Sequence, residues 1–229
     1  MRTITPALAL AFSLAFSLTS VVSACFAHAA DPATPQGGLV IAGGGLKADN
    51  AAVWQAFIEA VPADGPVVIV PSASGEPALS AASVERTLLS YGVGADRIRI
   101  APLATMDDPS TQEVDESLWA GNGHDAGTVA LLEGAAGVWF TGGDQSRTTS
   151  VLLGTPALDA VRQARAGGAV IGGTSAGAAI MSDPMIAQGD TLRALGVTQT
   201  GESLRLADGL GFLPGVVVDQ HFGERARLG

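Results

Sequence analysis

Short, mostly apolar runs rich in β-branched residues recur along the chain, and each is soon followed by a glycine, a proline or an acidic residue. The runs cover residues 39–42, 67–70, 98–100, 138–140, 170–171 and 216–218. Runs of this kind are typical of short parallel strands buried on both faces of a sheet. We therefore predict six strands, each of which ends at a turn.

Stretches of helical length separate these runs. Within residues 50–61 the apolar side chains recur at three- and four-residue spacing, which gives one apolar stripe along a helix. Similar patterns predict helices over residues 81–91, 125–132, 151–165 and 176–187. Alternation of strands and helices predicts an α/β fold, a three-layer sandwich with a mostly parallel sheet and helices on both faces. Catalytic groups in such folds gather at the carboxyl ends of the strands.

The first thirty residues have the pattern of a secretory signal peptide. A basic start precedes an apolar run over residues 4–22, and the small residues of Ala27-His28-Ala29 suit cleavage near residue 29 or 30. A lipoprotein signal ending at Cys25, or a transmembrane anchor, are the alternatives. Phe26 is an unusual neighbour for a lipidated cysteine, so we expect a secreted or periplasmic protein without stable membrane insertion after processing.

Composition narrows the function classes. The chain has 229 residues and a formal net charge of −10, from 12 Lys+Arg and 22 Asp+Glu. Such an acidic surface argues against nucleic acid as a partner and tolerates a cationic substrate. The length fits one domain over residues 31–229. The chain has a single cysteine, so it cannot form an intramolecular disulfide, and its fold does not require an oxidising compartment. The oligomeric state stays open, with a homodimer as one option.

The sharpest local motif is Gly-Thr-Ser-Ala-Gly around Ser175. A β-branched run precedes it and an alanine-rich, helix-forming stretch follows it, which is the context of a nucleophile elbow. The glycines that flank the motif permit a sharp turn that presents the hydroxyl, and the backbone N–H of Ala176 would help to stabilise an oxyanion. The alternative is an ordinary glycine-rich turn with a capping serine.

A serine nucleophile needs a base, and His221 and His124 are the two histidines that follow the signal region. His221 comes directly after the predicted strand 216–218, so we expect it to be the base. His124 lies in a glycine-rich stretch, and we interpret it as a surface residue or a lid contact in a polar loop over residues 105–124. The acidic residue that would orient the imidazole is open among four positions, Asp183, Asp190, Glu202 and Asp208.

A further constellation, Gly142-Gly143-Asp144-Gln145, follows the predicted strand 138–140. The glycines permit close approach of a ligand to the backbone, and Gly143 is a second candidate oxyanion donor. A turn with a helix cap is the alternative. With Ser175 and His221 also at predicted strand ends, we expect all these groups to converge on one crevice.

Three segments together resemble the cyanophycinase family of serine peptidases. They are residues 140–147 (FTGGDQSR), 172–179 (GGTSAGAA) and 217–229 (VVDQHFGERARLG). The similarity extends more weakly from Leu39 to the end of the chain. This family also includes aspartyl dipeptidases, and its fold is similar to that of class I glutamine amidotransferases, with serine in place of the nucleophilic cysteine.

The resemblance implies a role for each matching residue. Ser175 is the nucleophile and His221 the base, and Asp190 is our choice for the acid by its spacing from Ser175. The residues that the family uses to shape its substrate pocket match Gln145, Asp219, Gln220, Arg225 and Arg227.

The implied substrate is cyanophycin, multi-L-arginyl-poly-L-aspartate, cleaved to β-Asp-Arg dipeptides without a metal or other cofactor. Asp144, Asp219 and Gln145 would receive guanidinium groups, while Arg225 and Arg227 would pair with carboxylates. The family pattern has a further arginine and more structure after the position of Gly229, so we expect this peptidase domain to be truncated.

The sequence also leaves three other functions open. An aspartyl dipeptidase of the same family is the nearest alternative. A lipase-like α/β-hydrolase would share the serine motif but would usually carry an HGGG-type oxyanion loop, which the sequence lacks. A non-catalytic binding protein with an amidotransferase-like fold is the last option.

Overall fold

The computed structural model describes residues 36–189 and 204–221, all of which belong to one compact unit, Ala33–Gly229. The predicted signal peptide lies outside the described residues. Five parallel strands form the central sheet in the order β1-β5-β4-β2-β3. They are β1 (Leu39–Ala42), β2 (Val67–Val70), β3 (Ile98–Ile100), β4 (Gly137–Phe140) and β5 (Val170–Thr174). All five lie where the apolar runs predict strands.

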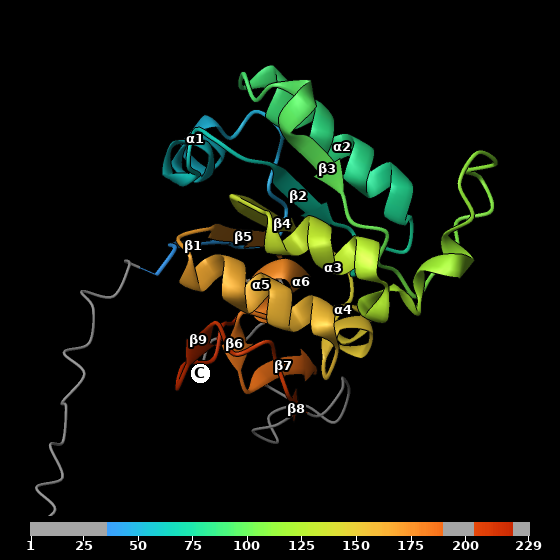
Figure 1. Ribbon diagram of the computed structural model, residues 1–229. Coiled ribbons are helices and arrows are strands. Elements are labelled where there is room, and N and C mark those ends of the chain that lie inside the picture. The colour runs from blue at the N-terminus through green and yellow to red at the C-terminus, as the bar shows by residue number, and fades with distance from the viewer. Residues whose placement is uncertain (1–35, 190–203, 222–229) are drawn as a thin grey trace, which may run out of the picture. The chain divides into compact units, whose positions relative to one another are not determined.

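Helices cover both faces of this sheet (Figure 1). Two of them, α1 (Ala51–Ala60) and α2 (Pro77–Ser90), pack with Ile69 and Trp139 in one apolar core. The opposite core contains Val70 and Phe140 together with residues of α3 (Ala126–Glu133), α4 (Gln145–Leu152) and α5 (Pro156–Ala166).

Neighbouring residues of one strand thus enter opposite cores, which is why these strands are apolar on both faces. The predicted three-layer α/β sandwich is confirmed. Three short 3₁₀ helices complete this part of the chain, η1 (Ala95–Arg97), η2 (Glu116–Trp119) and η3 (Asn122–His124). No helix within the described ranges is long and apolar enough to cross a bilayer.

Three predicted helices differ in extent from those in the structure. The helix predicted over 151–165 is two helices, because α4 ends at Leu152 and α5 begins at Pro156, with Thr155 as its N-cap. Proline suits the first turn of a helix but not its interior. The helix predicted over 176–187 ends after one turn, as α6 (Ala176–Ala179), and Pro184 interrupts the stretch that follows. The helix predicted over 81–91 begins earlier, at Pro77, where proline again opens the helix.

Short strands replace the end of that predicted helix. β6 (Ser182–Asp183) pairs in parallel with β9 (Leu213–Pro214), and β7 (Met185–Gln188) pairs in antiparallel orientation with β8 (Arg205–Ala207). Arg165 of α5 connects that helix to the segment before β9. Its Nη1 donates to the carbonyl of Phe212 at 2.6 Å, and its guanidinium lies over the Phe212 ring. Burial lowers the pKa of Arg165 from its usual value, although the group stays protonated at physiological pH.

The sixth predicted strand, over residues 216–218, is wrong. These residues form no strand, and Val216 and Val217 are 46% and 44% exposed. β-Branched residues favour extended backbone, but a strand also needs a partner edge for its N–H and C=O groups. The edges of the described sheet do not extend to this segment. His221 is therefore not placed at the carboxyl end of a sheet strand.

Candidate active site

Ser175 occupies the sharp turn between β5 and α6. Its backbone has φ 53° and ψ −113°, a conformation that side-chain-bearing residues rarely adopt. Two hydrogen bonds fix the turn to the end of β1, from Ser175 N–H to Ala42 O (3.1 Å) and from Thr174 Oγ1 to Gly43 O (2.8 Å). A strained residue held by paired neighbours is typical of functional sites. The predicted strand–turn–helix context of a nucleophile elbow is confirmed.

His221 lies beside this hydroxyl. The distance from Ser175 Oγ to His221 Nε2 is 3.0 Å, which is within reach for proton transfer. Ser175 Oγ also donates to Gln220 Oε1 at 3.3 Å, and Gln220 is buried. His221 itself has a positive φ of 57°. The tertiary structure thus brings the predicted base to the predicted nucleophile without the predicted strand.

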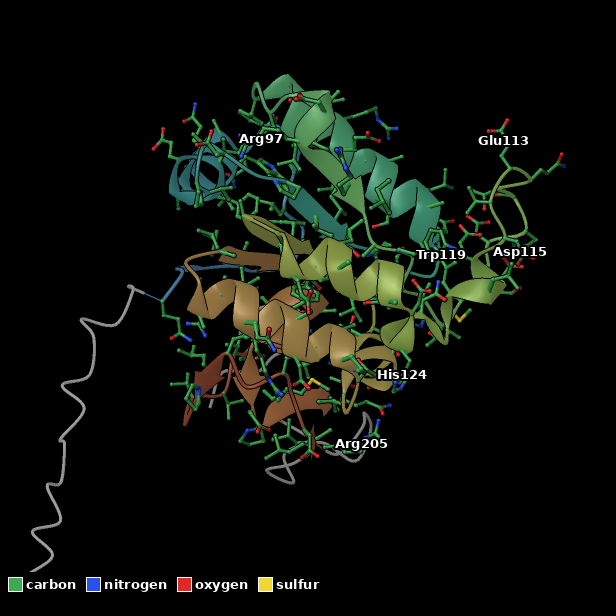
Figure 2. All side chains as sticks on the ribbon, viewed as in Figure 1. Arg97, Glu113, Asp115, Trp119, His124 and Arg205 are labelled. Atoms are coloured by element: carbon green, nitrogen blue, oxygen red, sulfur yellow. The ribbon has the colours of Figure 1, made fainter. Side chains whose placement is uncertain are left out.

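His124 is in a different environment. It ends η3, and its side chain is exposed, as Figure 2 shows. This position fits the expectation of a surface residue.

The glycine loop after β1 contacts the imidazole of His221. A Cβ atom at Gly44 would overlap the His221 ring, whereas one at Gly43 would meet nothing within 4 Å. Gly44 therefore leaves the space in which the base approaches Ser175. Residues 43–45 are all glycine and follow β1 directly. Three consecutive glycines after a strand were a signal of close approach.

The turn between β4 and α4 forms the opposite side of the serine. A Cβ atom at Gly142 would lie 3.3 Å from Ser175 Cβ. Gly143 has a φ of 140°, and a side chain there would overlap the carbonyl oxygen of Ala73. That oxygen accepts a 2.8 Å hydrogen bond from Asp144 N–H and a longer one, 3.4 Å, from Arg147 Nη1. The turn after β2 thus supports the turn that carries Gly143.

Two backbone N–H groups at these turns are available to a ligand. Within the described ranges, neither Ala176 N–H nor Gly143 N–H donates a hydrogen bond. Ala176 follows the nucleophile directly, and Gly143 is exposed beside Gly142. Both are the donors that the sequence predicts for an oxyanion, and their use in catalysis stays a prediction.

Asp144 and Gln145 differ in their surroundings. Asp144 is exposed, and its Oδ1 accepts from Ser146 N–H at 2.8 Å as the N-cap of α4. Gln145 is 3% exposed, and its Nε2 donates to the carbonyls of Ile186 (2.8 Å) and Ala187 (2.7 Å). The amide therefore joins α4 to β7. A contact of either residue with substrate stays a prediction.

The other predicted site residues are only partly placed. Asp190, Glu202, Arg225 and Arg227 lie outside the described residues. Asp183 Oδ1 accepts from Gly209 N–H at 3.3 Å, and Asp208 is exposed. Asp219 is half-buried next to Gln220. The acidic partner of His221 stays a prediction.

The amino-acid sequence of this chain matches a known protein family. A sequence model of Peptidase family S51 matches residues 39–228. The chain belongs to peptidase family S51. This assignment confirms the predicted resemblance to the family of the cyanophycinases.

Two curated S51-like relatives illustrate the similarity. The chain is 35% identical over 199 residues to a cyanophycinase of Nostoc sp., covering 86% of this chain and 60% of the relative. It is 32% identical over 192 residues to a cyanophycinase of Geminocystis herdmanii, covering 83% of this chain and 63% of the relative. The chain thus spans less than two thirds of the length of these relatives.

A solved structure supports the fold of this S51 chain. It is a peptidase from an acI-B1 Actinobacterium, with a TM-score of 0.58 and 21% sequence identity, covering 84% of this chain and 71% of that one. At this identity the likeness concerns the fold alone.

Proposed function

We propose that this protein is a serine peptidase that hydrolyses cyanophycin and releases β-Asp-Arg dipeptides. The observation that carries the proposal is the 3.0 Å contact between Ser175 Oγ and His221 Nε2. It occurs in a family S51 chain that is 35% identical to a protein named cyanophycinase. A serine hydroxyl next to an imidazole nitrogen is the arrangement that acyl transfer requires.

The proposed reaction has two halves. His221 Nε2 takes the hydroxyl proton as Ser175 Oγ attacks the peptide carbonyl, and the resulting oxyanion accepts hydrogen bonds from Ala176 and Gly143. The imidazolium then protonates the leaving amine, which departs and leaves an acyl-enzyme. In the second half, a water molecule gives a proton to His221 and attacks the ester, and Ser175 recovers its hydroxyl proton. Gln220 Oε1 accepts from the hydroxyl before reaction, and in this way orients it in the resting enzyme.

Substrate recognition follows from the charges of cyanophycin. Each repeating unit carries a guanidinium group and a carboxylate. Asp144, Asp219 and the carbonyl oxygen of Gln145 are the proposed partners for guanidinium groups, and Arg225 and Arg227 those for carboxylates. A pocket that pairs both groups rejects an analogue lacking one, because a buried polar group is then left unpaired.

The test compares three substrates with the purified protein. We expect release of β-Asp-Arg from insoluble cyanophycin, measured by chromatography and mass spectrometry, and little cleavage of an α-linked protein such as casein. The Ser175→Ala variant is the blank in each assay. Efficient hydrolysis of short α-aspartyl dipeptides with cyanophycin left intact would instead make the protein an aspartyl dipeptidase.

We also propose that the protein is exported, with residues 1–30 removed as a signal peptide. The basic start, the apolar run and the small residues near Ala29 support this proposal. Mass spectrometry of the mature N-terminus would find a chain that begins near residue 30 or 31. A lipid-modified Cys25 would instead support the lipoprotein alternative.

A further inference from the structure

A groove with mostly apolar walls lies beside the first turns of α2, at a distance from the serine along the chain. Its volume is about 670 Å³. Ala78, Leu79 and Ala82 of α2 form one wall, and residues 110–114 form the other, with Ile100 and Trp119 completing the lining. Figure 2 shows Trp119 near the beginning of α2, with Glu113 and Asp115 on the projecting loop.

A buried carboxylate holds the two walls together. Glu116 has no exposed surface, and its Oε1 accepts from the backbone N–H of Ala78 at 3.2 Å. Its Oε2 accepts from Thr111 Oγ1 at 3.0 Å. Because this side chain links α2 to the loop, the groove is a formed part of the fold, which lowers the cost of ordering it around a ligand.

Among the side chains that line the groove, the one charged group is the carboxylate of Glu113. Between Arg99 and Arg147 the sequence contains eight Asp or Glu residues and no Lys or Arg. Glu113 lines the groove and is exposed, as is Asp115 close by in the same loop. The apolar wall of α2, the indole ring of Trp119 and the carboxylate of Glu113 fit side chains with an aliphatic stem and a cationic end. Arginine has this form.

The groove is at the same edge of the sheet as Ser175. All five strands are parallel, so the turns after β5, β4, β2 and β3 follow one another along the carboxyl edge. Ser175 follows β5, Gly143 follows β4, Ala73 follows β2, and Ile100 ends β3. Three strand spacings of roughly 4.8 Å separate β5 from β3, or about 14 Å. An extended polymer backbone covers that span with about four residues, at roughly 3.3 Å each.

We propose that this groove is a second binding site for the arginine-bearing polymer whose end is cleaved at Ser175. The inference rests on the proposed function and adds where the uncleaved part of the substrate is held. Arginine stems lie along Leu79 and Ala82, and their guanidinium groups meet Trp119 and Glu113. The groove keeps a long chain bound between successive cleavages. It therefore increases the affinity of the enzyme for polymers but not for short peptides.

Two leucines of α2 provide a matched pair of variants. Leu79 lines the groove and is 46% exposed, while Leu89 lies in the same helix, is 40% exposed and does not line the groove. Leu79→Lys places a cation where the arginine side chains would lie. Leu89→Lys adds the same charge elsewhere in α2. Both leucines are on the surface, so both variants should fold, as thermal unfolding would verify.

Binding is measured separately from cleavage. Each substitution is introduced into the Ser175→Ala protein, and binding to insoluble cyanophycin is followed by co-sedimentation. We expect Leu79→Lys to weaken binding at least about tenfold and Leu89→Lys by less than about twofold. Glu113→Gln should weaken binding about threefold, with Glu59→Gln on α1 as its control. In the active protein, Leu79→Lys should raise KM for the polymer while the rate on a β-Asp-Arg dimer stays the same.

The outcomes separate the two proposals. Equal binding by the Leu79→Lys and Leu89→Lys proteins would overturn the groove even if the active enzyme releases dipeptides. A second outcome would also overturn it: the protein is a homodimer, and Leu79→Lys dissociates this homodimer without weakening polymer binding. The groove would then join two copies of the chain. Absence of dipeptide release by the active protein would overturn the proposed function, whatever the sedimentation result.

Discussion

Ser175 and His221 lie 3.0 Å apart, but the segments that carry them are built differently. Ser175 follows β5, which is hydrogen-bonded to β1 on one side and β4 on the other. Every residue of the helix that follows, α6, is buried. The nucleophile therefore follows a strand that is paired on both of its edges.

The segment that leads to His221 lacks such pairing. It contains only the two-residue strand β9, and the rest of residues 208–221 is irregular. Arg162 and Arg165 of α5 donate to its carbonyls at Leu210 and Phe212, and other hydrogen bonds join it to the residues just after α6. Leu210 N–H donates to Ile180 O and Leu213 N–H to Met181 O, both at 2.7 Å. Val218 N–H donates to Ser182 Oγ at 3.2 Å. The base is thus positioned by a chain segment that attaches to the end of the nucleophile helix.

The comparison teaches that the two halves of the site depend on different interactions. Local backbone geometry places the serine, whereas a few long-range hydrogen bonds and the space beside Gly44 place the histidine. Variants of the first kind should change chemistry without changing stability. Variants of the second kind should change both.

Loss of the nucleophile should give the largest effect. We expect Ser175→Ala to lower cyanophycin hydrolysis by roughly 10⁴-fold or more, because Ser175 Oγ is the hydroxyl next to His221, whereas Thr174 Oγ1 at the same turn donates to Gly43 O. The midpoint temperature of thermal unfolding should be unchanged or slightly higher, because the turn does not depend on the serine hydroxyl. Near-normal activity in this variant would refute the assignment of Ser175.

Loss of the base should be nearly as damaging. His221→Ala removes the proton acceptor, and we expect a fall in turnover of roughly 10³- to 10⁴-fold. His124→Ala is the control, because that exposed histidine ends η3, and its activity should stay within about twofold of the parent. Comparable losses in both variants would mean that His221 is not the unique base.

Gly44 gives a sharper test of how the base is placed. Gly44→Ala should lower turnover by about 10²-fold, the scale expected for a misplaced catalytic group, because its methyl group overlaps the imidazole. Gly43→Ala should have little effect, since that methyl group enters open space. The same difference between the two variants should appear in the rate at which a serine-directed reagent labels Ser175, and this rate is what we would measure.

A double-mutant cycle separates this effect from general damage. In the His221→Ala background, Gly44→Ala should cause no further loss, because the ring it would displace is gone. Additive losses in the two variants would show that Gly44 acts independently of His221.

Gln145 tests the connection between α4 and β7. Gln145→Leu leaves the carbonyls of Ile186 and Ala187 without their donor, which should lower the free energy of unfolding by about 2 kcal/mol. Gln163→Leu, on the exposed face of α5, is the control. Urea unfolding measures both. Normal stability of Gln145→Leu would show that the amide does not hold α4 to β7, and a raised KM for cyanophycin would support the proposed contact of Gln145 with substrate.

The smallest effect should come from Ser182. Its hydroxyl donates to Ala179 O and accepts from Val218 N–H, so Ser182→Ala should cost about 1 kcal/mol of unfolding free energy and a few-fold in turnover. Ser150 makes the same local bond, to Arg147 O, and no long-range bond to the part of the chain that the structure describes. Ser150→Ala should therefore leave turnover unchanged. Equal turnover in both variants would mean that Ser182 does not help to place His221.

The fold was predictable because its strongest signals are local. The five sheet strands are apolar runs between turns, and the stripe of residues 50–61 gives α1. The serine elbow was predictable for the same reason, since glycines, a preceding strand and a following helix are all within thirteen residues. The ends of the helices were harder to predict, because Pro156 and Pro184 interrupt helical patterns of apolar residues that otherwise continue.

The sequence by itself determined the layers of this protein and the position of Ser175 at a strand end. Only the tertiary structure decided that residues 216–218 form no strand, because pairing depends on a free sheet edge and not on β-branched residues alone. It alone placed His221 against Gly44, residues 177 positions apart in the chain. That contact depends on how two distant loops fold toward one another, which no local pattern of side chains encodes.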